Sequence, residues 1–316
     1  MMFSVIVPLY NKEAYVAKAL ESVLSQTFRD FELIVVNDGS RDRSKETAEA
    51  VLEKATVPFR ILDQENAGVS IARNNGAAAS HGDFLCFLDA DDWWAPTFLE
   101  EMSGLISECP DAGLYATGYV IVNEKKRKTR IAPVGVEDGF TKGYIDYFQV
   151  YAKTLCMPVT SITACIPRSR FESAGGFPSG ITLGEDFLLW ALLALRNKTA
   201  FLNKPLAFYN QDADPSDRAV GRLHDPNRHM LWNLEKVCDL ERTCPDFKKL
   251  IDRLRVYGLW PYWLNPAYHI QAKQELEKVD WTNVDPVWKT TYRFPVGIMR
   301  FYDSLLRLGA KIKTKL

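Results

Sequence analysis

The chain has 316 residues, of which 47% are hydrophobic and 25% charged, and its formal net charge is −1. This composition is ordinary for a globular protein with one large domain or two smaller ones. A charge so close to zero excludes a general attraction to nucleic acid or anionic membranes, so any such attraction has to be local. No apolar run reaches membrane-spanning length, and no basic segment precedes the first apolar stretch. We therefore expect no signal peptide and a cytoplasmic protein.

The first hundred residues alternate between short apolar runs and helical patterns. Helical spacing of apolar residues predicts helices over 12–25, 42–54 and 68–79. Apolar runs rich in β-branched residues predict strands between them, over 4–8, 31–36, 59–62 and 84–88. Strands that are apolar nearly throughout are buried on both faces, so we expect a mostly parallel α/β sheet flanked by helices.

The order of elements changes after Pro96. Here we predict helices near 96–108 and 186–196, and strands over 113–122, 161–166 and 200–202. The polar stretch 212–217 has the composition of a linker, and the rest of the chain has mainly helical spacing. We therefore predict a first domain over 1–212 and a mainly helical C-terminal region over 213–316.

Three carboxylates directly follow the predicted strand 84–88. They are Asp89, Asp91 and Asp92, and on extended backbone Asp89 and Asp91 would point the same way. One or two carboxylates, completed by the phosphates of a substrate, suit a hard divalent cation, which would also offset the repulsion among them. The carboxyl end of a parallel strand is where open α/β sheets bind ligands. Helix capping before Pro96 is the alternative.

A second acidic motif, Asn37-Asp38-Gly39-Ser40, ends the predicted strand 31–36. In dinucleotide-binding folds such an acid holds a ribose, but those folds need a glycine-rich turn after the first strand. Residues 8–13 contain no glycine, which disfavours a nicotinamide or flavin cofactor. Asp38 could instead accept the imide N–H of uracil, thymine or guanine, and an Asp-Gly turn without a ligand is the alternative.

Two further motifs place charged residues near the start of predicted helices. Arg73 follows the loop 65–68 and could pair with a phosphate, with Asp89 or Asp91, or with a surface carboxylate. Glu185 and Asp186 open the apolar helix 186–196, where capping is the alternative to catalysis. If Asp186 is a base, we expect the helix N-terminus to keep it ionised at pH 7, which would make it a weak base.

Taken in order along the chain, these motifs resemble those of family 2 glycosyltransferases with the GT-A fold. The resemblance covers roughly residues 2–212 and is carried by the segments 4–11, 37–40, 65–68 with 72–74, 87–92, 175–177 and 184–186. It implies a Rossmann-like, mostly parallel sheet. It also implies an enzyme that moves a sugar from a nucleoside-diphosphate sugar (UDP, dTDP or GDP) to an acceptor hydroxyl.

The resemblance also implies roles for individual residues. Asp91 would bind a divalent metal, Mn or Mg, that bridges the diphosphate of the donor, and Asp89 would contact the ribose. Asp186 would be the base that activates the acceptor hydroxyl in a single inverting displacement, with Glu185 beside it, and Asp92 would keep a capping role. The nucleotide site would be lined by Pro8, Tyr10, Glu13, Asp38 on the base, and Arg73 near the ribose or diphosphate.

Two departures from the family pattern bear on function. Where the family often has a histidine after a Tyr-Arg pair, this chain has the sequence of residues 208–212, Phe-Tyr-Asn-Gln-Asp, which puts a role for that histidine in doubt. The Gln-x-x-Arg-Trp motif of processive synthases is also missing, which predicts transfer of one sugar per encounter. The resemblance further implies a role in bacterial surface polysaccharide or glycoconjugate assembly, with a sugar or lipid-linked sugar as acceptor.

The C-terminal residues 294–316 have the pattern of a basic amphipathic helix. Apolar residues at helical spacing, from Ile298 to Ile312, would share one face, and five basic residues accompany one acid, Asp303. Such a helix can lie on the inner face of an anionic membrane as a peripheral contact. Packing of the stripe on the helical region is the alternative. The basic turn 125–130 could add to a membrane contact or be solvated.

Two other functions fit parts of the pattern. A sugar nucleotidylyltransferase shares the broad fold, but it would need a glycine-rich, arginine-containing loop after the first strand, which residues 8–13 do not provide. A catalytically silent nucleotide-sugar-binding or scaffold protein would keep the fold, but the intact carboxylates argue against it.

Overall fold

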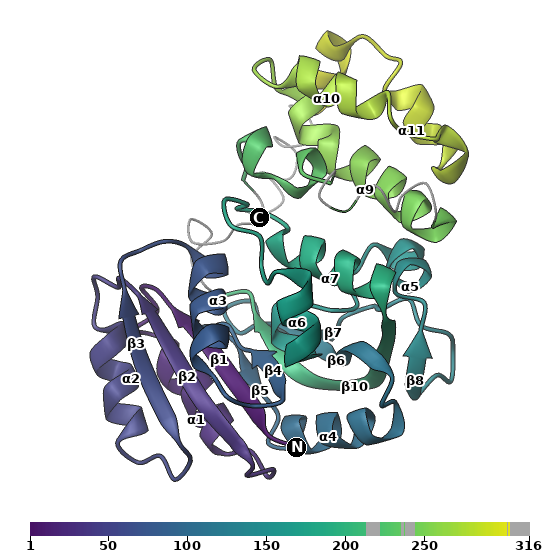
Figure 1. Ribbon diagram of the computed structural model, residues 1–316. Coiled ribbons are helices and arrows are strands. Elements are labelled where there is room, and N and C mark those ends of the chain that lie inside the picture. The colour runs from purple at the N-terminus through teal and green to yellow at the C-terminus, as the bar shows by residue number, and fades with distance from the viewer. Residues whose placement is uncertain (213–221, 235–236, 238–243, 302, 304–316) are drawn as a thin grey trace. The chain divides into compact units, whose positions relative to one another are not determined.

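The computed structural model describes the chain except for residues 213–221, 235–236, 238–243, 302 and 304–316 (Figure 1). The chain divides into two compact units, Met1–Gly221 and Arg222–Leu316. The domain boundary predicted after residue 212 falls at the last described residue before the first gap, and it stays a prediction.

In the described residues of the first unit, ten strands form one mixed sheet, in the order β3-β2-β1-β4-β9-β6-β10-β5, with β7 beside β6 and β8 beside β10. The strands that run in one direction are β1 (Phe3–Leu9), β2 (Phe31–Asp38), β3 (Phe59–Gln64), β4 (Phe84–Phe87), β6 (Ala112–Asn123) and β10 (Lys198–Asn210). Those that run the other way are β5 (Trp93–Trp94), β7 (Lys128–Ile131), β8 (Lys142–Ile145) and β9 (Ala164–Pro167). The predicted mostly parallel sheet is confirmed.

Helices flank this sheet on both faces (Figure 1). They are α1 (Val16–Leu24), α2 (Ser44–Leu52), α3 (Val69–Ala79), α4 (Phe98–Glu108), α5 (Tyr147–Thr154), α6 (Arg168–Ala174) and α7 (Glu185–Arg196). Successive side chains of a strand point to opposite faces. Val5 and Val7 of β1 therefore lie in the core formed with α1, α2 and α4, whereas Ile6 faces α3, next to Gly76. On that second face, the rings of Phe87 and Phe171 connect β4 to α6.

The described part of the second unit is mainly helical, as predicted. It contains α9 (Pro245–Leu264), α10 (His269–Leu276) and α11 (Pro286–Thr291), joined by short turns. Its core includes Phe247, Leu250 and Ile251 of α9, each fully buried. No helix among the described residues is both long and apolar enough to cross a membrane. Of the predicted amphipathic helix 294–316, Phe294, Ile298 and Phe301 are largely exposed, and most of the rest lies outside the described residues.

Up to about residue 123, prediction and structure agree closely except for the short strand β5. Beyond it, the helix predicted over 186–196 is confirmed as α7, but several other elements differ. The strand predicted over 161–166 begins as a 3-10 turn, Ser161–Thr163, before β9. The strand predicted over 200–202 is only the start of β10, whose pairing with β6 shifts register around Pro205. Proline within a sheet is confined to edges and bulges. Because of this irregularity, the second half of β10 does not have the regular alternation by which a strand is predicted. The elements α5, α6, β5, β7 and β8 were not predicted.

Gly76 tests how tightly α3 packs on the sheet. A Cβ atom at Gly76 would lie 2.5 Å from Cγ2 of Ile6 and 3.1 Å from Cγ2 of Val36. These neighbours are β-branched and buried, so Gly76→Ala is expected to lower the free energy of unfolding by about 1–3 kcal/mol in urea titrations. The matched control is Gly104→Ala in α4, where nothing lies within 4 Å. That change should be neutral or stabilise by up to about 1 kcal/mol. Equal effects of the two changes would contradict the close packing.

Candidate functional site

The predicted site residues come from segments that meet at the carboxyl edge of the sheet. Because β1, β2 and β4 are parallel neighbours, the residues that follow them, 10–13, 39–42 and 88–92, emerge at one edge. Arg73 reaches this edge from α3, and Glu185 and Asp186 reach it from the first turn of α7. Ion pairs hold several of these segments together.

Arg73 is the central contact of the site. Its side chain is buried, with the residue 3% exposed, and its Nη2 donates to Oδ1 of Asp89 at 2.7 Å while Nη1 donates to Oε1 of Glu185 at 3.2 Å. The guanidinium also lies 5.0 Å from the ring centre of Phe177. Burial works against the charge, but Asp89 and Glu185 outweigh it, and the pKa of Arg73 is raised. One buried cation therefore joins the carboxylate cluster to the first turn of α7. Asp89 is one of the partners predicted for Arg73, and Glu185 was not predicted.

Asp91 has a different partner. Its Oδ2 lies 3.0 Å from Nζ of Lys12, in the turn after β1, and both side chains are about four-fifths buried. Burial raises the pKa of Asp91, and Lys12 offsets this only in part. Glu13 was predicted to line the nucleotide site, whereas its neighbour Lys12 was not predicted to have a role. The order of the strands could have indicated this pair. Because β1 and β4 are parallel neighbours, a cation that follows β1 can contact a carboxylate that follows β4.

The backbone of the carboxylate cluster is not extended, contrary to the prediction. The strand ends at Phe87, and the N–H of Asp92 donates to the carbonyl of Asp89 at 3.0 Å, which closes a turn. Asp89 and Asp91 consequently contact different cations. The capping role predicted for Asp92 is also wrong, because Oδ1 of Asp92 accepts from the backbone N–H of Asn210 at 2.7 Å. This bond ties the cluster to the end of β10.

Asp186 is a carboxyl group with a strongly shifted pKa. It follows Gly184, the N-cap of α7, and one of its oxygens accepts from the N–H of Phe187 at 2.7 Å. Burial, reinforced by the charge of Glu185, raises the pKa of Asp186 to about 7, although Arg73 lowers it in part. We had expected the helix N-terminus to keep Asp186 ionised at pH 7, and this expectation is wrong in part. The loss of solvation on burial disfavours the carboxylate more than the N-terminus of α7 stabilises it.

Asp38 is buried and holds the loop that leads into α3. Its carboxylate accepts from the N–H groups of Ala67 at 2.8 Å and Gly68 at 3.0 Å, and from Nε2 of Gln64 at 2.7 Å. Gly68 has a φ of +93°, which an L side chain rarely adopts. The structure thus shows a positioning role for Asp38, and its contact with a nucleobase stays a prediction.

The other predicted nucleotide-site residues lie around the turn after β1. Pro8 is buried within β1, opposite Val36 of β2. Tyr10 is 41% exposed at the carboxyl edge. The carboxylate of Glu13 accepts from the N–H of Arg43 at 2.9 Å, directly before α2. Tyr10 and Glu13 belong to the turn that contains Lys12, and Pro8 lies just before it in β1. The contact of these residues with a nucleotide stays a prediction.

The motif residues Asn74 and 175–177 have a shared structural task. The side chain of Asn74 accepts from the N–H of Phe177 at 2.9 Å and donates to its carbonyl at 2.8 Å. Gly176 has a φ of +73°, and a Cβ atom there would lie 2.6 Å from Oδ1 of Asn74. Only glycine suits this position. The two hydrogen bonds from Asn74 hold the ring of Phe177 beside Arg73.

The donor set fits a divalent metal that is shared with a substrate. Among the described residues, no group of three or more His, Cys, Asp or Glu side chains could hold a metal ion by itself. Hard cations such as Mg²⁺ are nevertheless commonly held by one or two carboxylates together with substrate phosphates. Asp91 is such a carboxylate. Asp89 pairs with Arg73 and Asp91 pairs with Lys12, and the family resemblance assigns the ion to Asp91.

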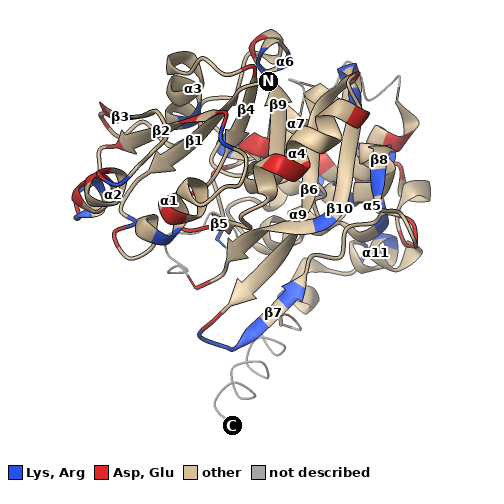
Figure 2. Cartoon of the chain, turned by 90° about the horizontal axis from the view of Figure 1, so that it is seen from below, with Lys and Arg blue, Asp and Glu red and all other residues tan. Residues whose placement is uncertain are grey.

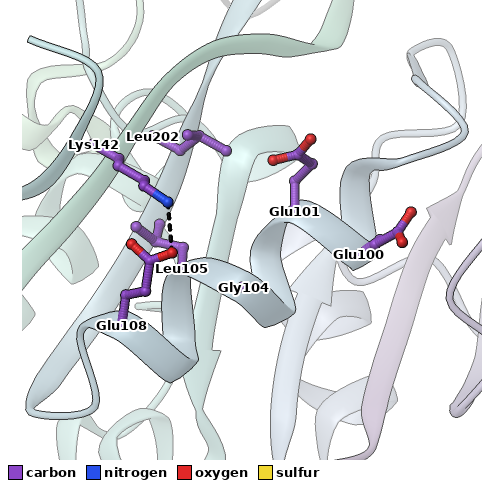
Figure 3. Close-up of a pocket in the computed structure, with 7 residues that line it drawn as sticks. All are labelled: Glu100, Glu101, Gly104, Leu105, Glu108, Lys142 and Leu202. Carbon is purple, nitrogen blue, oxygen red and sulfur yellow. Dashed lines mark hydrogen bonds and ion pairs between the residues drawn. The ribbon is translucent and has the colours of Figure 1, made fainter.

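A cavity of about 280 Å³ lies outside this site (Figure 3). Its lining residues are Glu100, Glu101, Gly104, Leu105, Glu108, Lys142 and Leu202. The charged groups there already have partners, because Lys142 pairs with Glu108 and Glu101 pairs with Lys204. None of the predicted site residues lines the cavity.

The buried pairs of Arg73 should matter far more for stability than an exposed pair. Arg73→Met leaves Asp89 and Glu185 without their cation and is expected to cost about 3–5 kcal/mol of unfolding free energy. The control, Lys142→Met, removes an exposed pair with Glu108 and should cost less than about 1 kcal/mol. Urea unfolding at pH 7.5 measures both. Similar losses in the two variants would show that Arg73 does not organise the site.

Known proteins share both the sequence pattern and the fold. The sequence model described as glycosyl transferase family 2 matches residues 4–163. An uncharacterized glycosyltransferase of Nostoc sp. is 40% identical over 230 residues, which cover 73% of this chain and 67% of that protein. The glycosyltransferase GlyA of Streptococcus pneumoniae is 33% identical over 214 residues, or 65% of this chain and 30% of GlyA. The chain spans about a third of the length of the first curated relatives that it matches.

Two solved structures have a similar fold. The crystal structure of TarS 1–349 of S. aureus in complex with UDP-GlcNAc has a TM-score of 0.59 at 21% identity, and covers 87% of this chain and 70% of that chain. The mannosyltransferase PcManGT from Pyrobaculum calidifontis, in complex with GDP-Man and Mn²⁺, has a TM-score of 0.59 at 17% identity, and covers 97% and 80%. The predicted GT-A type of fold is confirmed. The chain belongs to glycosyl transferase family 2.

Proposed function

We propose that this chain is an inverting, metal-dependent glycosyltransferase that moves one sugar from a nucleoside-diphosphate sugar to an acceptor hydroxyl. The observation that carries the proposal is the pair of ionic contacts through which Arg73 joins Asp89 to Glu185, the neighbour of Asp186. They hold a carboxyl group with a pKa of about 7 next to a cluster that suits a metal and a diphosphate. The structural relatives contain UDP-GlcNAc, or GDP-Man with Mn²⁺, which supports a nucleotide-sugar donor here.

Asp186 would act as the general base. It would take the proton of the acceptor hydroxyl while that oxygen attacks the anomeric carbon, and the electron pair of the bond to the diphosphate oxygen would leave with the nucleoside diphosphate. Attack from the side opposite the leaving group inverts the configuration. A pKa of about 7 makes Asp186 a stronger base than an ordinary aspartate and leaves it substantially ionised at neutral pH.

The donor would bind along the carboxyl edge. A divalent ion, Mn or Mg, held by Asp91 and the diphosphate of the donor, would stabilise the charge of the leaving group. Lys12 would offer a second cation to the same diphosphate, since it already contacts Asp91. Asp89, fixed by Arg73, would bind the ribose, so that Arg73 acts on the donor through Asp89. Residues Pro8, Tyr10, Glu13 and Asp38 would surround the nucleoside.

We assign the nucleotide-sugar domain to residues 1–212 and propose that residues 213–316 contact the acceptor or a membrane. The missing Gln-x-x-Arg-Trp motif supports the transfer of a single sugar per encounter. Assembly of a bacterial surface polysaccharide or glycoconjugate is the role that we propose, with a sugar or lipid-linked sugar as acceptor.

The donor can be identified before any acceptor is known. Thermal unfolding of the protein with UDP, dTDP or GDP, each with Mn²⁺ or Mg²⁺, should give a higher melting temperature for the matching nucleotide, because a ligand that binds only the folded state stabilises it. The corresponding sugar nucleotides are then assayed for donor hydrolysis and transfer. Metal-dependent nucleotide binding without turnover on any acceptor would favour a silent binding protein instead.

Substitutions separate the two assigned roles. Asp91→Asn should remove the metal-dependent part of nucleotide binding. Asp186→Asn should keep that binding and lower kcat by roughly 10²–10⁴-fold, the contribution of a general base. Asp111→Asn, at an exposed pair with Lys198, is the matched control and should behave as the unchanged protein. If Asp91→Asn and Asp186→Asn retain full transfer, the assigned roles are wrong.

The pH dependence follows from the raised pKa of Asp186. Because the ionised form is the base, kcat/KM should rise with pH up to about 7 and then level off. Stability has the opposite dependence: the unfolded chain ionises near the ordinary value of 3.8, so the folded protein loses stability as pH rises from there to about 7. Asp186→Asn should remove this loss and resist urea better than the unchanged protein at pH 8 but not at pH 4. An advantage that is independent of pH would contradict the assignment.

A further inference from the structure

A strongly basic hairpin projects from the first unit. It consists of residues 124–131, the turn after β6 and the strand β7, with five basic residues and one acid, Glu124. Every one of these residues is exposed, and β7 appears as a blue, outlying strand in Figure 2. Within the described part of the chain, Lys126, Lys128 and Arg130 have no carboxylate within ion-pair distance. Ile131 ends the hairpin with 64% of its surface exposed.

The hairpin is attached to the same edge of the sheet as the proposed site. Strands β4 and β6 both run antiparallel to β9 and therefore share a direction, so the turn after β6 and the carboxylates after β4 emerge at one edge. Hydrogen bonds connect them. The N–H groups of Glu124 and Lys125 donate to the carboxylate of Asp212. The N–H of Asp212 donates to the side chain of Asn210, whose own N–H donates to Asp92.

The arrangement of the cations indicates the kind of partner. They are spread along an exposed turn and strand and do not converge on a cavity, so they fit an extended plane of negative charge better than a single bound ion. The net charge of the whole chain is only −1, so a local group of five cations would attract an anionic surface and orient the molecule on it. Basic residues beside an exposed apolar residue are typical of contacts with anionic lipid headgroups.

We propose that the basic hairpin docks on an anionic bilayer, so that the carboxyl edge with Asp89 and Asp91 faces the lipid headgroups. This contact goes beyond the proposed transfer reaction. It also places the site where an acceptor carried by a lipid would be met. The contact requires neither donor nor metal, so it can be measured independently of transfer.

Vesicle co-sedimentation with the full chain tests the proposal. Vesicles of phosphatidylglycerol and phosphatidylcholine should bind the protein at low salt, and vesicles of phosphatidylcholine alone should not. The variant with Lys126→Gln, Lys128→Gln and Arg130→Gln should bind roughly a hundredfold more weakly, since each basic residue near such a surface contributes about a fivefold effect. Arg127 is left unchanged because its φ is +49°.

The matched control removes the same charge elsewhere. Lys54→Gln, Arg170→Gln and Lys249→Gln lie at exposed positions outside the hairpin, and this variant should keep its binding within about threefold. Equal losses in both variants would show a general charge effect and overturn the proposal. So would wild-type binding by the hairpin variant, since the contact would then lie elsewhere. Binding to RNA or heparin without binding to vesicles, or loss of vesicle binding in millimolar inorganic phosphate at constant ionic strength, would also overturn it.

Discussion

The buried guanidinium of Arg73 is the interaction on which the arrangement of the site depends. A cation removed from water is tolerated only with partners, and Arg73 has two, Asp89 and Glu185, from segments about a hundred residues apart in the chain. The dependence is mutual, because two carboxylates that lie this close together need the cation between them. The neighbouring Asn74 adds a second link by holding Phe177, whose ring lies against Arg73. Helix α3 thereby determines where the first turn of α7, with Asp186, is held.

Much of the fold is predictable because its pattern is local. In the first ninety residues, each strand has an apolar centre and each helix has its own apolar stripe, and the predicted positions differ from the observed ones by only a few residues. The pattern fails where structure depends on distant partners. Strand β10 contains Asn203, Lys204 and Pro205 in its middle, and it is held as a strand by pairing with β6. The strands β7 and β8 are short edge strands with exposed residues, so no apolar run marks them.

The segments of the site were predictable, and their contacts were less so. Parallel strands bring their carboxyl ends together, so the meeting of the turns after β1 and β4 follows from strand order alone. Which carboxylate contacts which cation does not, because it depends on the turn that Asp89 and Asp92 close. The state of Asp186 was also beyond prediction, since its pKa reflects burial, which a sequence does not show. Lys12 was predictable from strand order but was not predicted, because the family resemblance assigns a role to its neighbour Glu13 and none to Lys12.

The contacts of Asp38 have a consequence for how donor preference can change. A carboxylate that only recognised a base would be a natural place to alter specificity, by evolution or by engineering. Here the same carboxylate also accepts from the N–H groups of Ala67 and Gly68, ahead of the helix that carries Arg73. Replacing it would release that loop and loosen the helix start. We therefore expect changes of nucleotide preference to arise at exposed neighbours such as Tyr10. Asp38 would be retained because it holds the loop before α3.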